Sequence, residues 1–282
     1  MLKATLDISD AHFGDAGQLL ATLEECADRA IAQVKDAGPD EVEVVLNGDW
    51  VAGRGIFRDQ GLQSTVQLGS EQVWFGAWYI RQWQVKLKAA RWVVIRGNHD
   101  QANKEDLARE LVMILRALDV PAVYQGRTYV GNFSPDESKP CWFEAQHGFG
   151  ASSYYANSYE GIRDCWRMYI QHSQQSQILI NRFLRGHTHW LNVGQAIGFE
   201  VAIDTTGGWH RQERDKLSSA ARNTGLLLYL HDGLKLQPVP IEADCKLLTQ
   251  ETDDPGLHYQ TMARAAAALS EATRWARAQG LA

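Results

Sequence analysis

Apolar residues along the chain follow two spacings. Short runs rich in Val, Ile and Leu are typical of buried strands, and they occur at residues 1–8, 41–46, 91–95, 122–124, 128–133, 142–146 and 178–184. Apolar residues three and four apart predict helices over residues 15–37, 70–88, 103–118, 159–176 and 256–280. Asn103 would cap the third of these helices. Strands that alternate with helices indicate an α/β fold.

The later part of the chain adds two predicted hairpins. Residues 193–203 and 224–239 alternate apolar and polar positions, and Asp232-Gly233 provides a turn signal in the second. No internal repeat or linker divides the sequence. We therefore predict one domain over residues 1–245, followed by a helical appendage over 246–282 that packs outside it or mediates a homodimer.

Composition and charge narrow the class of protein. The 282 residues are 45% hydrophobic and carry a formal net charge of −6, which argues against non-specific wrapping of nucleic acid. It does not exclude a nuclease, because bound divalent cations can reverse the local sign. The four cysteines show no CxxC spacing and indicate reduced thiols. With no signal peptide and no apolar run long enough for a membrane span, we expect a cytoplasmic protein with no membrane partner.

Polar residues follow the predicted strands at five places. These tips are Asp10-x-His12, Gly48-Asp49, Gly97-Asn98-His99-Asp100, His147-Gly148 and Gly186-His187-Thr188-His189. Because sites in open α/β folds lie beyond the carboxyl ends of strands, we expect the tips to converge. Any one of these motifs is short enough to arise by chance, but their joint occurrence at strand ends indicates a site.

The residue types at these tips suit a dinuclear metal site. Carboxylates, an amide and imidazoles, without sulfur, favour Mn²⁺, Fe or Zn²⁺, and we expect Mn²⁺. Two cations with open positions for water and substrate need about seven protein ligands. The candidates are Asp10, His12, Asp49, Asn98, His147, His187 and His189.

The order of the five motifs resembles that of the calcineurin-like metallophosphoesterase superfamily, which includes the Mre11/SbcD nucleases, over residues 2–210. The resemblance implies a four-layer α/β sandwich of two mixed β-sheets flanked by helices, with the late hairpins building much of the second sheet. It also implies that a metal-bridging hydroxide hydrolyses a phosphate ester. The implied ligands of the first metal are Asp10, His12 and His189, those of the second are Asn98, His147 and His187, and Asp49 bridges the two.

The same resemblance suggests roles for the two residues after Asn98. His99 would contact the phosphate and protonate the leaving oxygen as a general acid. Asp100 would either orient His99 or cap the following helix.

The segment from Gly48 to Gln60 is also similar to the second motif of the small subunit of archaeal D-family DNA polymerase. In this reading Arg54 and Arg58 grip phosphate and Trp50 stacks on a base, although surface arginines and a core tryptophan are the alternatives. The motif favours a DNA 3′–5′ exonuclease. Two alternatives stay open: a phosphoesterase acting on nucleotides, cyclic nucleotides or phosphomonoesters, and a catalytically dead scaffold.

Overall fold

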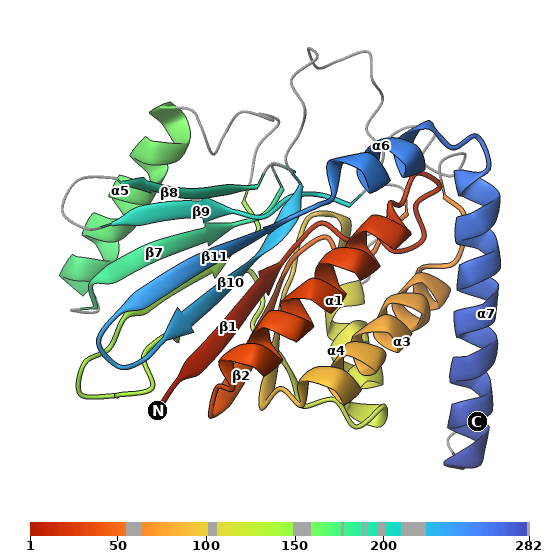
Figure 1. The fold of residues 1–282 in the computed structure, drawn as a ribbon, viewed down its shortest axis with the longest axis horizontal. Helices are drawn as coiled ribbons and strands as arrows, with labels where there is room; N and C mark the ends of the chain where they lie inside the picture. Colours follow the sequence, from red (N-terminus) through yellow and green to blue (C-terminus); the bar gives the residue numbers. More distant parts are fainter. Residues whose placement is uncertain are drawn as a thin grey trace.

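Two β-sheets pack face to face and are covered by helices on both outer sides (Figure 1). This computed structural model describes residues 1–54, 64–100, 106–148, 159–175, 178–187, 189, 191–196, 201–209 and 224–280. The four layers confirm the predicted α/β sandwich. Within these ranges no helix is both long and apolar enough to cross a membrane.

The first sheet has six strands in the order β11-β10-β1-β2-β3-β4. Its members are β1 (Lys3–Ile8), β2 (Glu41–Asn47), β3 (Arg91–Ile95), β4 (Ala122–Tyr124), β10 (Gly225–His231) and β11 (Leu236–Glu242). Strands β1 to β4 are parallel, whereas β10 pairs antiparallel with both β1 and β11. The carboxyl ends of β1, β2 and β3 therefore share one edge.

The second sheet has five strands in the order β5-β6-β7-β9-β8. Its members are β5 (Thr128–Asn132), β6 (Trp142–Gln146), β7 (Ile180–Arg185), β8 (Asn192–Ala196) and β9 (Ala202–Thr205). The three central strands β6, β7 and β9 are parallel and the outer two are antiparallel to their neighbours. Both sheets are thus mixed.

Helices cover the outer face of each sheet. The first sheet is covered by α1 (Leu20–Ala37), α3 (Gly69–Leu87) and α4 (Leu107–Ala117), and the second by α5 (Tyr159–Gln175). Alternate residues of β1 show the division: Leu6 packs in the core beneath the helices, while its neighbour Asp7 points between the sheets. A separate apolar cluster, including Val45, Phe143 and Leu227, fills the space between the sheets.

The C-terminal segment contributes to the main core. Helix α7 (Leu257–Ala278) lies against α3 and buries Ala265, Ala268 and Ala272 in the same apolar cluster (Figure 1). Helix α6 (Cys245–Asp253) carries Glu251, whose carboxylate accepts hydrogen bonds from the backbone N–H groups of Ala21 (2.9 Å) and Thr22 (2.8 Å). Residue Leu19 offers no side-chain cap, so Glu251 caps α1 from a distant part of the chain.

Several details differ from the sequence prediction. Helix α1 begins at Leu20 rather than at residue 15, because the Asp15 carboxylate turns the chain by accepting the N–H of Gly17 at 2.6 Å. The predicted cap Asn103 lies outside the described residues, and Asp106 caps α4 through the N–H of Arg109. Both hairpins form, but only β8/β9 joins the second sheet. The β10/β11 hairpin extends the first, so the prediction that both build the second sheet was wrong.

The Glu251 cap gives a stability prediction. Glu251→Ala removes the acceptors of three hydrogen bonds, including one from the Thr22 hydroxyl, and should lower the free energy of unfolding by about 1–2 kcal/mol in urea denaturation. Gln250→Ala, an exposed change on the same helix, should stay within about 0.5 kcal/mol of wild type. Equal effects of the two substitutions would contradict the capping role.

Asp7 gives a prediction on pH dependence. Burial between the sheets, aided by the negative charge of Asp204, raises the pKa of this carboxyl well above its ordinary value of 3.8. The folded state therefore binds a proton that the unfolded chain releases, so stability falls as pH rises from about 4 toward the folded pKa. Asp7→Asn should be more stable than wild type at pH 8, with a gap that narrows toward pH 4.

Urea unfolding across this pH range measures the gap. The exposed change Asp36→Asn is the control and should leave the stability profile unaltered. An Asp7→Asn protein less stable than wild type at pH 8 would contradict the account.

Candidate metal centre

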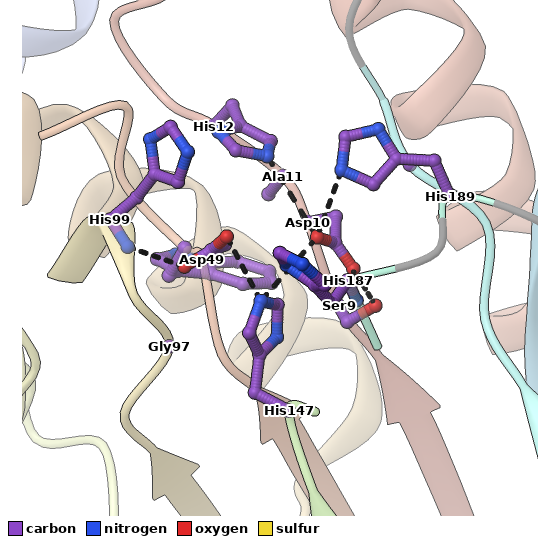
Figure 2. Close-up of polar contacts among 12 residues, drawn as sticks. Ser9, Asp10, Ala11, His12, Asp49, Gly97, His99, His147, His187 and His189 are labelled. Carbon is purple, nitrogen blue, oxygen red and sulfur yellow. Dashed lines mark hydrogen bonds and ion pairs between the residues drawn. The ribbon is translucent and has the colours of Figure 1, made fainter. Parts of the chain in front are cut away.

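Strand ends from both sheets meet at one edge of the sandwich and carry the five predicted motifs. Asp10 and His12 follow β1, Asp49 follows β2, and His99 follows β3. From the second sheet, His147 follows β6, while His187 and His189 follow β7. Figure 2 shows the histidine side chains of both sheets gathered around the carboxylates of Asp10 and Asp49, with the His99 ring beside His12. The structure thus gathers six of the seven predicted ligands and His99 in one place.

The backbone at this edge is strained. Five of the gathered residues, Asp10, His12, Asp49, His187 and His189, have positive φ angles between 48° and 70°. Asp and His tolerate this left-handed region better than most residues, but such conformations still cost free energy and concentrate at functional sites. These left-handed conformations turn the backbone at the strand ends, and the side chains of these residues face the centre.

The first group consists of Asp10, His12 and His189, whose candidate ligand atoms all lie within 4.8 Å of one another. Oxygen Oδ1 of Asp10 faces Nε2 of His189 at 3.1 Å and Nε2 of His12 at 3.8 Å. The other oxygen, Oδ2, is fixed by the Ser9 hydroxyl and by the backbone N–H of His187 at 2.8 Å. One carboxylate oxygen is therefore held by the protein and the other points into the group.

The second group consists of Asp49, His147 and His187, again within 4.8 Å. Nitrogen Nδ1 of His147 lies 2.7 Å from the carbonyl oxygen of Asn47, and since a carbonyl can only accept, Nδ1 carries a proton. This leaves Nε2 directed at the site, 2.9 Å from Oδ2 of Asp49 and 3.7 Å from Oδ1 of Asp10. His147 therefore contacts carboxylates of both groups and joins them into one centre.

The electrostatics of the centre favour a cation. Burial would lower the pKa of His147, but the negative charges of Asp49 and Asp10 outweigh it and raise that pKa to about 10. Burial would likewise raise the pKa values of Asp10 and Asp49, but the positive charge of His147 holds both below their usual range. The buried carboxylates thus demand positive charge beside them, which divalent cations supply by displacing a proton.

The donor set fits two cations. Oδ1 of Asp10 is buried and accepts no hydrogen bond among the described residues, as expected of an atom that binds a metal. Burial lowers the pKa of His12 to about 4, so its ring is neutral near pH 7, the form that binds metals. The two Asp/His groups therefore fit a dinuclear metallophosphoesterase centre. Asn98, the seventh predicted ligand, is exposed in the turn after β3, beside His99.

His99 lies at the rim of the centre. Its ring meets the His12 ring edge to face, with centroids 4.6 Å apart, and its backbone N–H donates to Oδ1 of Asp49 at 2.7 Å. Nitrogen Nδ1 lies 2.7 Å from the carbonyl oxygen of Ala52. This carbonyl therefore orients the ring, in the place where Asp100 was expected.

Asp100 has a different position from the one predicted. Its buried carboxylate accepts N–H groups of Asp49 (2.9 Å), Trp50 (3.0 Å), Val51 (3.3 Å) and Gly97 (2.9 Å). Burial and the nearby charge of Asp49 raise its pKa to about 6. Asp100 thus ties the loop after β2 to the loop after β3, while Asp106 is the residue that caps α4.

The three residues predicted to contact the substrate lie in different environments. Arg54 is exposed just after the Asp49 loop, and Arg58 lies outside the described residues. Trp50 is 1% exposed and packs against Phe13 and Trp83 in the core, so its ring is not accessible to a substrate base. Here the prediction of a stacking tryptophan was wrong.

The sequence analysis missed three residues near the centre: Ser9, Thr206 and Asp15. Ser9 and Thr206 exchange a hydrogen bond at 2.6 Å beneath Asp10, and only the position of Ser9 next to Asp10 could have suggested its role. Asp15 is mostly buried near His99 and His189, and burial raises its pKa to about 6. No motif marks Asp15.

With the fold and the centre in view, comparison with known proteins gives the family. The family model described as calcineurin-like phosphoesterase matches residues 8–191, more than half of the chain. This protein belongs to the calcineurin-like phosphoesterase family. Membership and the two Asp/His groups together support a metal-dependent phosphoesterase.

Solved structures resemble the chain more distantly. A Vps29 variant from Entamoeba histolytica is 14% identical, with 85% of this chain and 99% of that chain covered and a TM-score of 0.40. The sulfate thiohydrolase SoxB from Thermus thermophilus is 12% identical, with 95% and 60% covered and a TM-score of 0.45. The NAD nucleotidase of Haemophilus influenzae is 12% identical, with 85% and 50% covered and a TM-score of 0.36. No curated protein matches the sequence.

Close packing at Gly97 gives a prediction for the centre. A Cβ at this position would collide with the Asp49 carboxylate, whose Cγ would lie 2.8 Å away. Gly97→Ala should therefore displace Asp49, lower the bound metal per chain and reduce phosphodiester hydrolysis by about 100-fold, since displacements of about 1 Å cost that much. Metal analysis and hydrolysis of bis-p-nitrophenyl phosphate measure both effects.

The matched control is Gly256→Ala, where the nearest atom is the flexible Asp254 carboxylate at 3.1 Å. It should keep wild-type metal content and rate. A Gly97→Ala protein that retains both would contradict the packing argument.

Proposed function

We propose that this protein is a dinuclear metal-dependent phosphodiesterase that degrades DNA as a 3′–5′ exonuclease. The observation that supports phosphoester hydrolysis is the pair of Asp/His groups joined by His147 around two buried carboxylates. Divalent cations bound there would lower the pKa of water toward neutrality and neutralise charge on the substrate phosphate.

The protein residues around the cations have distinct tasks. Asp10 and Asp49 each have one oxygen held by a backbone N–H, of His187 and of His99 respectively, so their remaining oxygens are aimed before a cation binds. The Ala52 carbonyl holds the Nδ1 proton of His99, so in the doubly protonated ring Nε2 is the atom whose proton can pass to the leaving oxygen, which leaves the neutral Nδ1–H ring.

Two features support a diester, and DNA in particular. A phosphodiester carries one negative charge, whereas a phosphomonoester carries up to two. The Asp15 carboxyl near His99 and His189 adds negative charge to the site, which disfavours the second negative charge of a monoester. The segment from Gly48 to Gln60 is similar to a DNA polymerase-associated motif, and Arg54 is exposed just after the Asp49 loop, which supports DNA.

A small phosphoester is the second candidate. It is favoured by the net charge of −6 and by the burial of Trp50, which removes an aromatic ring that could have stacked on a base. A nucleotide or cyclic nucleotide needs no extended basic surface, because its contacts end within the site.

The test uses metal-free protein reconstituted with Mn²⁺. It is offered end-labelled single- and double-stranded DNA beside bis-p-nitrophenyl phosphate, with His99→Ala as the catalytic control. Stepwise shortening of DNA from the 3′ end, reduced by about 100-fold or more in His99→Ala, is the expected result. Cleavage of the small diester without any shortening of DNA would overturn the DNA assignment and favour the small phosphoester.

A further inference from the structure

Gln72 lies in the first turn of α3 and has no solvent exposure. Its side-chain oxygen accepts the backbone N–H of Gly53 at 2.9 Å, and its side-chain nitrogen donates to the carbonyl oxygens of Val66 (2.7 Å) and Gly53 (3.3 Å). A Cβ at Gly14 would lie 2.6 Å from Cγ of Gln72, so the side chain is also closely packed against the chain after His12. A buried polar side chain on a helix therefore fixes the chain just beyond the Asp49 loop.

The Gly53 N–H belongs to the same peptide unit as the Ala52 carbonyl. This peptide bond is trans, so its N–H and its C=O point in opposite directions in one rigid plane. The N–H side is held by Gln72, and the carbonyl side accepts from Nδ1 of His99 at 2.7 Å. Gln72 and His99 are thus connected through a single planar group.

This connection controls two properties of the His99 ring. A carbonyl has no proton to give, so the contact requires the proton on Nδ1 and selects one tautomer of the neutral ring. Hydrogen bonds in series also polarise one another, so an acceptor on the N–H side strengthens the carbonyl as an acceptor. If the peptide rotated, His99 would lose both its tautomer preference and its orientation beside His12.

We propose that Gln72 is a positioning residue for His99, acting through the Ala52–Gly53 peptide unit to keep the Nδ1–H of the ring on the Ala52 carbonyl, so that proton transfer falls to Nε2. The inference rests on the proposed function, because the placing of the ring matters for catalysis only if the doubly protonated His99 gives its Nε2 proton to the leaving oxygen and is left as the neutral Nδ1–H ring. Gln72 itself touches neither substrate nor metal in this role.

The chain offers a matched control. Gln84 lies on the same helix, donates to the Ala89 carbonyl at 3.1 Å and accepts from Nε1 of Trp92 at 2.6 Å. It is a glutamine with the same bracing chemistry but no link to His99. Gln84→Met therefore measures the effect of losing a hydrogen-bonded glutamine from this helix without altering the contact to His99.

Activity is measured with the dinucleotide thymidylyl-(3′→5′)-thymidine, whose alkoxide leaving group needs a proton. Bis-p-nitrophenyl phosphate, whose p-nitrophenolate leaves without one, is the comparison substrate. For the dinucleotide, Gln72→Met should lower kcat by about tenfold, less than removal of His99 itself, with little change in KM or in bound metal. For bis-p-nitrophenyl phosphate the loss should be smaller. In a His99→Ala background the same substitution should cause no further loss, because the residue through which it acts is gone. Gln84→Met should keep wild-type kcat. Equal losses of kcat from Gln72→Met in both backgrounds would overturn the proposal.

The tautomer is measured separately by ¹⁵N NMR of histidine-labelled protein loaded with diamagnetic Zn²⁺. Wild type and Gln84→Met should show His99 protonated at Nδ1, whereas Gln72→Met should shift the ring toward the Nε2–H tautomer. Gln72→Glu keeps an acceptor for the Gly53 N–H and should keep the wild-type tautomer, which provides a second test if Gln72→Met does not fold. A Nε2–H ring in Gln72→Glu, or an unchanged Nδ1–H ring in Gln72→Met, would overturn the connection.

The two levels of failure are distinguishable. If the wild-type protein cleaves neither DNA nor the small diester, the proposed function fails while the NMR result still tests the link from Gln72 to His99. If the wild type is active and Gln72→Met matches it in kcat and tautomer, the proposed function stands and this inference fails.

Discussion

The structure of the centre depends on two carboxylates that are buried at the edge of both sheets and need positive charge beside them. Asp10 and Asp49 are almost completely removed from water, and His147 contacts an oxygen of each. Unpaired buried charges of this kind would be strongly unfavourable, so positive charge must be supplied beside them. The same carboxylates raise the pKa of His147, so they hold a proton where they would otherwise hold cations.

The fold brings this arrangement about through parallel strands and close-packed loops. Three parallel strands of each sheet end at the same edge, so short loops deliver ligands from both sides. The left-handed backbone at five of these residues costs stability, and polar anchors offset it. Asp100 binds the N–H groups of two loops, and Ser9 supports Asp10 from beneath. Gln72 holds the segment that follows Asp49.

Much of this was predictable because chemistry at strand ends is a local signal. Asp10, Asp49, His147 and the His187–His189 pair stand immediately after apolar runs, so both their identity and their convergence could be read from order alone. The sandwich followed from the same alternation of strands and helices.

The remainder depends on contacts between distant residues. Glu251 caps a helix that begins 231 positions earlier, and Gln72 meets Gly53 through its own side chain, with no periodicity to mark either. The β10/β11 hairpin joins the first sheet because β10 pairs with β1. The alternation of apolar and polar residues predicts a strand but does not identify its partner. Trp50 followed a ligand in sequence and was assigned to the substrate, but successive residues after a strand can point in opposite directions. Its ring lies in the core.

The most direct test of the central claim is a crystal structure of the protein with Mn²⁺, read from the anomalous scattering of the metal. The account predicts two anomalous peaks per chain, one among Asp10, His12 and His189 and the other among Asp49, His147 and His187. A crystal at saturating Mn²⁺ that shows no peak in either group, or peaks only elsewhere on the chain, would contradict it.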